Sequence, residues 1–406
     1  MLDITKAKPK IPAQSVLSLD VFGKEAFKCP TVLDVGEVRL TVNARTAFAL
    51  ALRDASIGHG ASVLIPAYHC PAMVSPVIWM GAEPIFYPIC SDTSVNVDVL
   101  SKYIRSDTRA LVAVHYFGFI QDLRPLRILC DKHNLILIED CAHTFFGNFE
   151  GRAVGSSGDY AIASIMKFLP IYEGGCIASS SRSLAGITMS SDGFFLQCKS
   201  ALNSIEMACE YARLPWFNYL LEIKQWIWDW LKSGAKKNRS SSPLVDSVGE
   251  LPAEGTIFDP SLLERKMSWS AIAIMKTMSV SRAYARRRAN YITLLNALGN
   301  IAGGRPLFGR LPENVCPQVF PMLVDAPSEV FPVLKKMGVP IIRFGEYRWN
   351  GVDGAICPVS DKLSRHVFQF PCHQSLTKEE LEWMIRSIIA ALQGKKNVSS
   401  NVTGEF

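Results

Sequence analysis

The chain has 406 residues, of which 49% are hydrophobic and 20% charged, and its formal net charge at pH 7 is +6. This length and composition exclude a disordered chain and allow a large core, divided into one large and one smaller domain. The modest positive charge comes without a zinc-finger, RNP or basic-repeat motif, so we expect no nucleic-acid binding.

Eleven cysteines are scattered singly along the chain, without a Cys-x-x-Cys pair. This spacing favours a reduced, cytoplasmic protein over a disulfide framework. The N-terminus has no apolar signal core, and no long uncharged stretch could span a bilayer. Cys357 and the Cys372-His373 pair lack metal-ligand spacing, so we expect no metal site.

After an N-terminal segment, 1–39, the region 40–182 alternates short apolar strands with helical stretches. The strands are expected at 62–65, 110–114 and 135–138, and the helices at 46–56, 71–80 and 124–133. This alternation predicts an α/β domain with a mainly parallel sheet flanked by helices. The ligand site of such a sheet lies at the carboxyl ends of the strands. His115 and Asp140 both fall at such ends.

Residues 183–262 are less regular and include four of the eight tryptophans within 15 residues. An aromatic helix with a basic end, 216–239, favours a buried subunit interface, and a peripheral membrane contact is the alternative. The Ser-rich stretch 240–255 predicts a connecting segment.

The last part of the chain predicts a second, smaller domain. A long helical segment, about 261–298, leads into a C-terminal α+β domain, so that the helix and this domain together occupy 263–394. Its markers are an apolar strand at 319–324, a helix that ends at Gly338 and a closing helix from Thr377. Residues 395–406 are expected to form a flexible tail.

The clearest chemical signal surrounds Lys167. An apolar strand ends in Glu139-Asp140, and Ser164-Ile165-Met166-Lys167 follows it, with Glu173-Gly174-Gly175 shortly after. A strand-end acid, a Ser-x-x-Lys loop and a diglycine are what a pyridoxal phosphate enzyme needs. The lysine forms the Schiff base, the aspartate keeps the ring nitrogen protonated, and the serine helps to bind the phosphate.

Several further motifs follow in a fixed order. They are Asn43-Ala44-Arg45-Thr46-Ala47, Ile65-Pro66-Ala67-Tyr68, Val114-His115-Tyr116-Phe117-Gly118, Glu139-Asp140-Cys141-Ala142-His143 and the segment 151–159, Gly-Arg-Ala-Val-Gly-Ser-Ser-Gly-Asp. In this order they resemble the DegT/DnrJ/EryC1/StrS sugar aminotransferases, a family of fold-type I pyridoxal phosphate-dependent transferases. The resemblance implies that fold, that cofactor and a homodimer.

The resemblance also implies the residues of the site. Thr46 and the amides around Ala44 and Arg45 would open a helix whose N-terminus suits a dianionic phosphate. Asp140 would pair with the ring nitrogen, and Lys167 would form the Schiff base and carry the proton. The implied cofactor-binding set is Ala44, Arg45, Thr46, Tyr68, His69, Asp140, His143, Ser164 and Lys167, with Lys167 and Asp140 as the catalytic residues.

This chain also departs from the family pattern. Ile162 stands where many members have the phosphate-binding serine, and Cys70 where they have the aromatic residue that stacks on the ring, so Tyr68 or His69 would cover the ring instead. The family's Asn-Tyr-Arg-Met-Ser element, donated across the dimer, corresponds here to 264–268, Glu-Arg-Lys-Met-Ser.

The leading functional hypothesis is therefore an aminotransferase that moves an amino group from glutamate to a nucleotide-linked keto-sugar. The presence of Lys167 favours a transaminase, because the related dehydratases carry histidine at that place. One alternative keeps the cofactor but acts on a non-sugar substrate, by transamination or by elimination. The other is a non-catalytic, membrane-associated scaffold that uses the Trp-rich segment.

Overall fold

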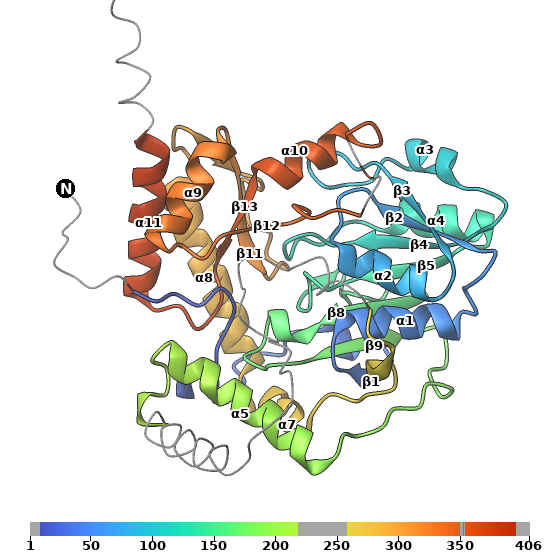
Figure 1. Ribbon diagram of the computed structural model, residues 1–406, viewed down its shortest axis with the longest axis horizontal. Helices are drawn as coiled ribbons and strands as arrows, with labels where there is room; N and C mark the ends of the chain where they lie inside the picture. Colours follow the sequence, from blue (N-terminus) through green and yellow to red (C-terminus); the bar gives the residue numbers. More distant parts are fainter. Residues whose placement is uncertain (1–8, 218–257, 350–351, 353, 395–406) are drawn as a thin grey trace, which may run out of the picture.

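The computed structural model describes residues 9–217, 258–349, 352 and 354–394 (Figure 1). Its larger sheet has seven strands in the order β1-β9-β8-β5-β4-β2-β3. They span Glu37–Thr41 (β1), Ser62–Pro66 (β2), Glu83–Tyr87 (β3), Thr108–Val114 (β4), Ile136–Asp140 (β5), Tyr160–Ser164 (β8) and Gly175–Ser179 (β9). In this sheet β9 alone runs antiparallel to its neighbours. The predicted mainly parallel sheet is confirmed, together with its three predicted strands.

Helices connect the strands of this sheet, and the three predicted ones are present. They are α1 (Ala44–Asp54), α2 (Pro71–Trp79) and α4 (Arg124–His133), with a short α3 (Val97–Leu100) between β3 and β4. Local chemistry sets their ends. The Asn43 side chain caps α1, Pro71 occupies the first turn of α2, and Asn134 ends α4 at φ +54°.

The C-terminal part is built on a second, antiparallel sheet in the order β10-β11-β13-β12. Its strands are β10 (Gly304–Pro306), β11 (Val319–Val324), β12 (Ile342–Arg343) and β13 (Val367–Pro371), and its helices are α9 (Pro327–Met337), α10 (Pro358–His366) and α11 (Lys378–Gln393). As predicted, α9 ends at Gly338, whose φ is +85°, and Thr377 caps the closing helix. A small hairpin, β6 (Asn148–Phe149) and β7 (Arg152–Ala153), completes the strands.

The prediction of a single long helical segment at 261–298 is wrong. The chain forms a 3-10 turn at Pro260–Leu262, then α7 (Trp269–Thr277) and α8 (Val280–Leu298). The break falls at Met278-Ser279, where Ser279 caps α8. The Glu25 carboxylate accepts hydrogen bonds from the Val280 and Ser281 amides at 2.6 and 2.8 Å. A distant acid therefore stabilises the new helix start at its positive end.

Of the predicted Trp-rich region, the structure describes α5 (Phe194–Glu210) and a 3-10 turn at Pro215–Phe217. The remainder of the 216–239 segment and the 240–255 connection lie outside the described residues, as does the tail 395–406. Within the described ranges, no helix combines the length and the apolar character needed to cross a membrane. In Figure 1, α5 and α7 lie side by side below the two sheets, and they contact each other.

Candidate active site

Lys167 and Asp140 lie at the same edge of the large sheet. Asp140 is the last residue of β5, and β8 runs parallel beside it, with Asp140 opposite Ile162. Immediately after β8, the chain makes a 3-10 turn over Ile165–Lys167. The topology therefore brings the acid and the amine together at the carboxyl ends of neighbouring strands, where open α/β sheets bind their ligands.

The two groups influence each other's ionisation. Burial lowers the pKa of the Lys167 amine, while the charges of Cys70 and Asp140 raise it and that of Arg45 lowers it. Burial raises the pKa of the Asp140 carboxyl, and the Ala142 amide, at 2.8 Å, and the Lys167 charge oppose that rise. An amine with a lowered pKa is a better nucleophile and proton carrier near neutral pH.

The N-terminus of α1 is packed directly onto the segment that follows Lys167. The Gly174 amide donates to the Val42 carbonyl at 2.8 Å, and the Gly174 carbonyl accepts from the Met166 amide at 3.2 Å. A Cβ on Gly175 would lie 2.3 Å from the Asn43 carbonyl carbon and 2.6 Å from the Ala44 nitrogen. The diglycine is therefore required by close packing, and it holds the positive end of α1 against the turn that bears Lys167.

The remaining residues of the predicted phosphate site occupy this same junction. Thr46 is buried in the first turn of α1, and its amide donates to the Asn43 side chain at 2.9 Å. Ala44 and Arg45 form the start of the helix, and Ser164 is the buried last residue of β8. A helix N-terminus with a nearby hydroxyl is a site suited to a dianionic phosphate.

His143 lies in an aromatic cluster beside this junction. Its ring stacks with Phe117 at 5.9 Å and meets Phe344 edge-on at 4.9 Å. Burial and the charge of Lys167 lower its pKa well below the ordinary range, so the ring is neutral. The Tyr68 ring packs edge-on against the same Phe344 at 4.9 Å. Within the described residues, His143 Nδ1 and Tyr68 Oη are both buried without a hydrogen-bond partner.

His69 is held differently from the other predicted site residues. Its Nδ1 donates to the Ala67 carbonyl at 3.1 Å, its Nε2 accepts from the Trp349 amide at 3.0 Å, and its ring stacks on Phe86 at 4.8 Å. Burial lowers its pKa to about 4. His69 therefore anchors the segment at Trp349, and its contact with a cofactor ring stays a prediction.

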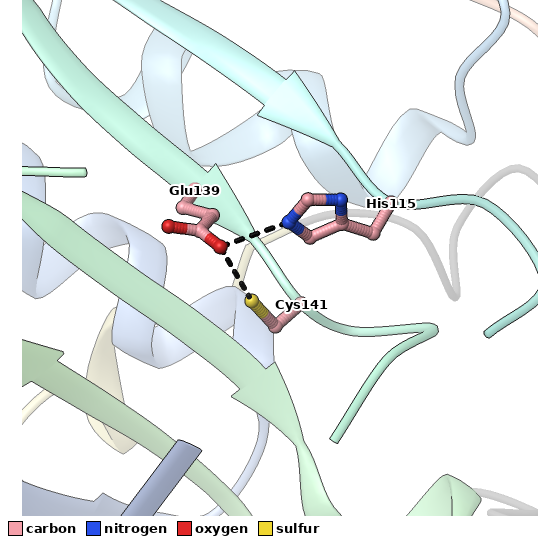
Figure 2. A group of neighbouring side chains, drawn as sticks. All are labelled: His115, Glu139 and Cys141. Atoms are coloured by element: carbon pink, nitrogen blue, oxygen red, sulfur yellow. Dashed lines mark hydrogen bonds and ion pairs between the residues drawn. The ribbon is translucent and has the colours of Figure 1, made fainter. Parts of the chain in front are cut away.

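A buried network beneath Asp140 joins three of the motifs found in the sequence. His115 accepts the Gln121 amide at Nδ1, so its proton lies on Nε2, which donates to Glu139 Oε1 at 2.8 Å. The Cys141 thiol contacts the same oxygen at 3.9 Å, and Figure 2 shows the three side chains together. The His115 side chain is thus a partner of Glu139, while its backbone amide donates to the Asp140 carbonyl at 3.1 Å.

Glu139 also accepts three backbone hydrogen bonds from the loop before β8. The amides of Gly155, Ser157 and Gly158 donate to it at 2.7, 2.9 and 3.1 Å. Hydrogen-bond donors, and not a metal ion, therefore use the acceptor capacity of this carboxylate. The network fixes the end of β5, and with it the position of Asp140, relative to β8.

Comparison with known proteins agrees with this arrangement. Residues 32–195 match the DegT/DnrJ/EryC1/StrS aminotransferase family. This match covers less than half of the chain. It contains every residue of the predicted cofactor site, from Ala44 to Lys167.

Two curated relatives share this region. The GDP-perosamine synthase of Vibrio cholerae is 34% identical over 152 residues, covering 37% of this chain and 41% of that protein. The L-glutamine:2-deoxy-scyllo-inosose aminotransferase of Streptomyces kanamyceticus is 34% identical over 139 residues, covering 34% of this chain and 33% of that protein. The matched region thus spans about two fifths or less of these relatives' length.

The structural likeness extends further along the chain. DesI, solved in the presence of its TDP-sugar product, superposes with a TM-score of 0.61 at 19% identity, covering 90% of this chain and 83% of that one. The likeness in fold to this solved structure therefore extends beyond residue 195. The fold-type I architecture expected from the sequence is confirmed.

Residues of the segment 264–268 make ion pairs and a hydrogen bond within this chain. Arg265 forms an ion pair with Asp192 and lies 3.6 Å from Glu173, and the Ser268 amide donates to Glu173 at 3.0 Å. Arg265 and Glu173 border a cavity of about 450 Å³ beside α5. This cation is therefore balanced by two acids of the same subunit.

The residues of the family site fit pyridoxal phosphate. Nδ1 of His143 is buried without a hydrogen-bond partner among the described residues, and the start of α1 is packed against the segment that follows Lys167. Ser164 and the start of α1 would hold the phosphate, Asp140 the ring nitrogen and His143 the ring hydroxyl. Sequence reasoning missed Arg287, which holds the Lys167 turn, and Phe344, which reaches the site from beyond β12.

Proposed function

We propose that this chain is a pyridoxal phosphate-dependent aminotransferase that moves an amino group from glutamate to a nucleotide-linked keto-sugar. The observation that carries the proposal is the placement of Lys167 and Asp140 at the carboxyl ends of the neighbouring strands β8 and β5, in a segment that matches an aminotransferase family. The names of GDP-perosamine synthase and of the DesI complex with a TDP-sugar support a nucleotide-linked acceptor.

Different residues of the chain would serve different roles in such a reaction. Pyridoxal phosphate, when bound, supplies an electrophilic carbon and a ring that withdraws electrons from the substrate. Lys167 would hold the cofactor at that carbon and would move a proton at the substrate carbon, which its lowered pKa favours. The Asp140 carboxylate stabilises positive charge on the ring nitrogen through a charge-assisted hydrogen bond. The aromatic cluster around Phe344 excludes water from the reacting atoms.

A homodimer in the cytoplasm is part of the proposal. All eleven cysteines lie among the described residues and are free thiols, which supports a reducing compartment. The exposed apolar side chains of α5, Phe194 and Phe195, support a partner subunit on that face.

The first test is an absorbance spectrum of the full chain with pyridoxal phosphate, before and after addition of glutamate. The wild type should show a visible band that glutamate bleaches. Lys167→Ala should lack this band and lose activity by about 10²–10⁴-fold or more. Lys132→Ala, which removes an exposed lysine of α4, is the matched control and should behave as the wild type.

Other outcomes separate the alternatives. Bleaching by glutamine and not by glutamate would keep the enzyme class and change the donor, in line with the glutamine-named relative from Streptomyces kanamyceticus. A stable band that no amino donor changes would indicate elimination or another non-sugar reaction. A wild type without any band would overturn the enzyme proposal and return attention to a scaffold role for the Trp-rich segment.

A further inference from the structure

The long helix α8 carries a fully buried arginine. The buried positions of α8 include Ala283, Arg287, Tyr291, Leu294 and Leu298, so that Arg287 occupies a core position of an otherwise apolar stripe. Its side chain is 0% exposed, and within the described residues it has no ion pair with a carboxylate. A buried cation is costly unless hydrogen bonds compensate it, so the partners of this guanidinium indicate what it does.

One side of the guanidinium is bound to the Lys167 turn. Nη2 donates to the Lys167 carbonyl at 3.1 Å and to the Phe168 carbonyl at 3.0 Å. The guanidinium carbon also lies 4.9 Å from the centre of the Phe168 ring. Two consecutive carbonyls and the next aromatic ring are thus fixed to one cation, which sets the direction in which the backbone leaves Lys167.

The other side of the guanidinium is bound to the small sheet. Nη1 donates to the carbonyls of Pro317 and Gln318, directly before β11, at 3.3 and 3.1 Å. Nε donates to Oε1 of Gln374, shortly after β13, at 2.8 Å, and the Gln374 amide group donates to the Phe168 carbonyl at 2.7 Å. The ends of the two central strands of the small sheet therefore converge on the turn that carries Lys167.

We propose that Arg287 is a positioning residue for Lys167, which ties the lysine-bearing turn of the large sheet to β11 and β13 of the small sheet. The inference rests on the proposed function, in which Lys167 is the reacting amine. Arg287 acts through the backbone of residues 167–168 and does not touch the reacting atoms. Displacement of a reacting group by about 1 Å can lower a rate about 10²-fold, so a residue that fixes this turn matters for the reaction.

The contacts at position 287 require the planar guanidinium group of arginine. Its contacts run to four carbonyls and one amide oxygen, in directions that a single ammonium group cannot serve. Arg287→Lys would keep the charge but lose most of these contacts, and Arg287→Met would lose them all. The neighbouring Arg288 offers a matched control, because it donates to the carbonyls of Pro312 and Val315 and not to the Lys167 turn.

The test measures Lys167 directly in the full chain freed of cofactor. Cyanate carbamylates neutral amines, so the pH dependence of Lys167 modification, read by peptide mass spectrometry, reports its ionisation, with free lysine in the same solution as the reference. In the wild type, Lys167 should be half-modified at a lower pH than free lysine, because burial lowers its pKa. In Arg287→Met the midpoint of Lys167 should move up towards that of free lysine, since a loosened turn admits water to the amine.

A second readout is the rate at which glutamate bleaches the visible band of the pyridoxal phosphate-loaded protein. We expect a fall of about 10²-fold in Arg287→Met, a smaller fall in Arg287→Lys, and no change in either readout in Arg288→Met. If Arg287→Met does not fold, both readouts are measured in Arg287→Lys. The inference would be overturned if that variant left the midpoint of Lys167 modification and the rate of bleaching by glutamate unchanged.

The outcomes separate this inference from the proposed function. A wild-type Lys167 that titrates like free lysine, with no visible band, would remove the proposed function itself. A wild-type Lys167 with a lowered midpoint that both Arg287 variants leave unchanged would remove only the role of Arg287. Equal shifts in Arg287→Met and Arg288→Met would indicate general loosening of α8 and would also overturn it.

Discussion

Two adjacent acids at the end of β5 show how position along a strand assigns different roles. Glu139 and Asp140 point to opposite faces of the sheet, because successive side chains of a strand alternate. Burial alone would raise the pKa of Glu139, but the hydrogen bond from His115 and those from the backbone amides hold it below the ordinary value. Asp140 receives the Ala142 amide, and burial leaves its pKa raised. The hydrogen-bonding capacity of Glu139 is used within the fold, whereas the Asp140 carboxylate remains available to a ligand.

This difference predicts opposite effects of two matched substitutions on the cofactor-free protein. Glu139→Gln places an amide donor against backbone donors and should lower the free energy of unfolding by about 1–3 kcal/mol. Asp140→Asn should raise it at pH 7, because the folded state no longer holds an unfavourable carboxylate. The same Asp140→Asn protein should lose activity by about 10²–10³-fold, since a charge aimed at the ring nitrogen is gone. Urea titrations and the glutamate reaction check both, and destabilisation of equal size in the two variants would contradict the assignment.

The pH dependence of stability follows from the sign of the Glu139 shift. Its pKa in the folded state lies below the ordinary value of 4.5. The stabilisation is therefore fully present above the unfolded-state pKa, and it is lost as the pH falls through the folded-state pKa. Urea titrations of the wild type should show stability falling as the solution becomes more acidic than about pH 4.5, and Glu139→Gln should show a shallower fall. An equally steep fall in the variant would assign the acid sensitivity to other carboxylates.

At the scale of elements, the helices and strands that could be predicted from the sequence are those marked by a pattern in neighbouring residues. The strands 62–65 and 110–114 and the closing helix from Thr377 follow from apolar runs and a capping residue. The division of 261–298 into two helices depends on Glu25, 255 positions from its partner Val280, and no local pattern contains that contact. Arg287 was missed because a run of three arginines looks like a solvated helix face. Its spacing of four from Ala283 and Tyr291 was the signal that placed it in the core.

The packing of α1 on β9 yields a prediction about the predicted phosphate site. Gly175→Ala would push its Cβ against the backbone of Asn43 and Ala44, so that the N-terminus of α1 must move. We expect a loss of about 1–3 kcal/mol in stability and weaker binding of pyridoxal phosphate, measured by equilibrium dialysis. Gly193→Ala is the control, because a Cβ there meets nothing within 4 Å. Unchanged affinity in Gly175→Ala would separate α1 from phosphate binding.

At the scale of the whole molecule, α5 and α7 lie together (Figure 1). What we call the α5–α7 face consists of the exposed large apolar side chains of α5, of the turn after it and of α7, which are Phe194, Phe195, Leu196, Leu202, Trp216 and Trp269. Phe194 and Phe195 are 81% and 74% exposed, which is unusual for phenylalanine in a helix of a folded monomer. The cavity lined by Glu173 and Arg265 also lies beside α5.

These observations predict a dimer formed through this α5–α7 face. Sedimentation velocity should show a dimer for the wild type, and Phe195→Asp should weaken the association by about tenfold or more, because it places a charge in an apolar contact. Ile128→Asp is the matched control: Ile128 is 69% exposed on α4, away from this face, and its replacement should leave the dimer intact. A wild type that sediments as an active monomer would contradict the dimer. A dimer broken by Ile128→Asp and not by Phe195→Asp would instead move the interface to α4, leaving the exposed phenylalanines of α5 for another partner.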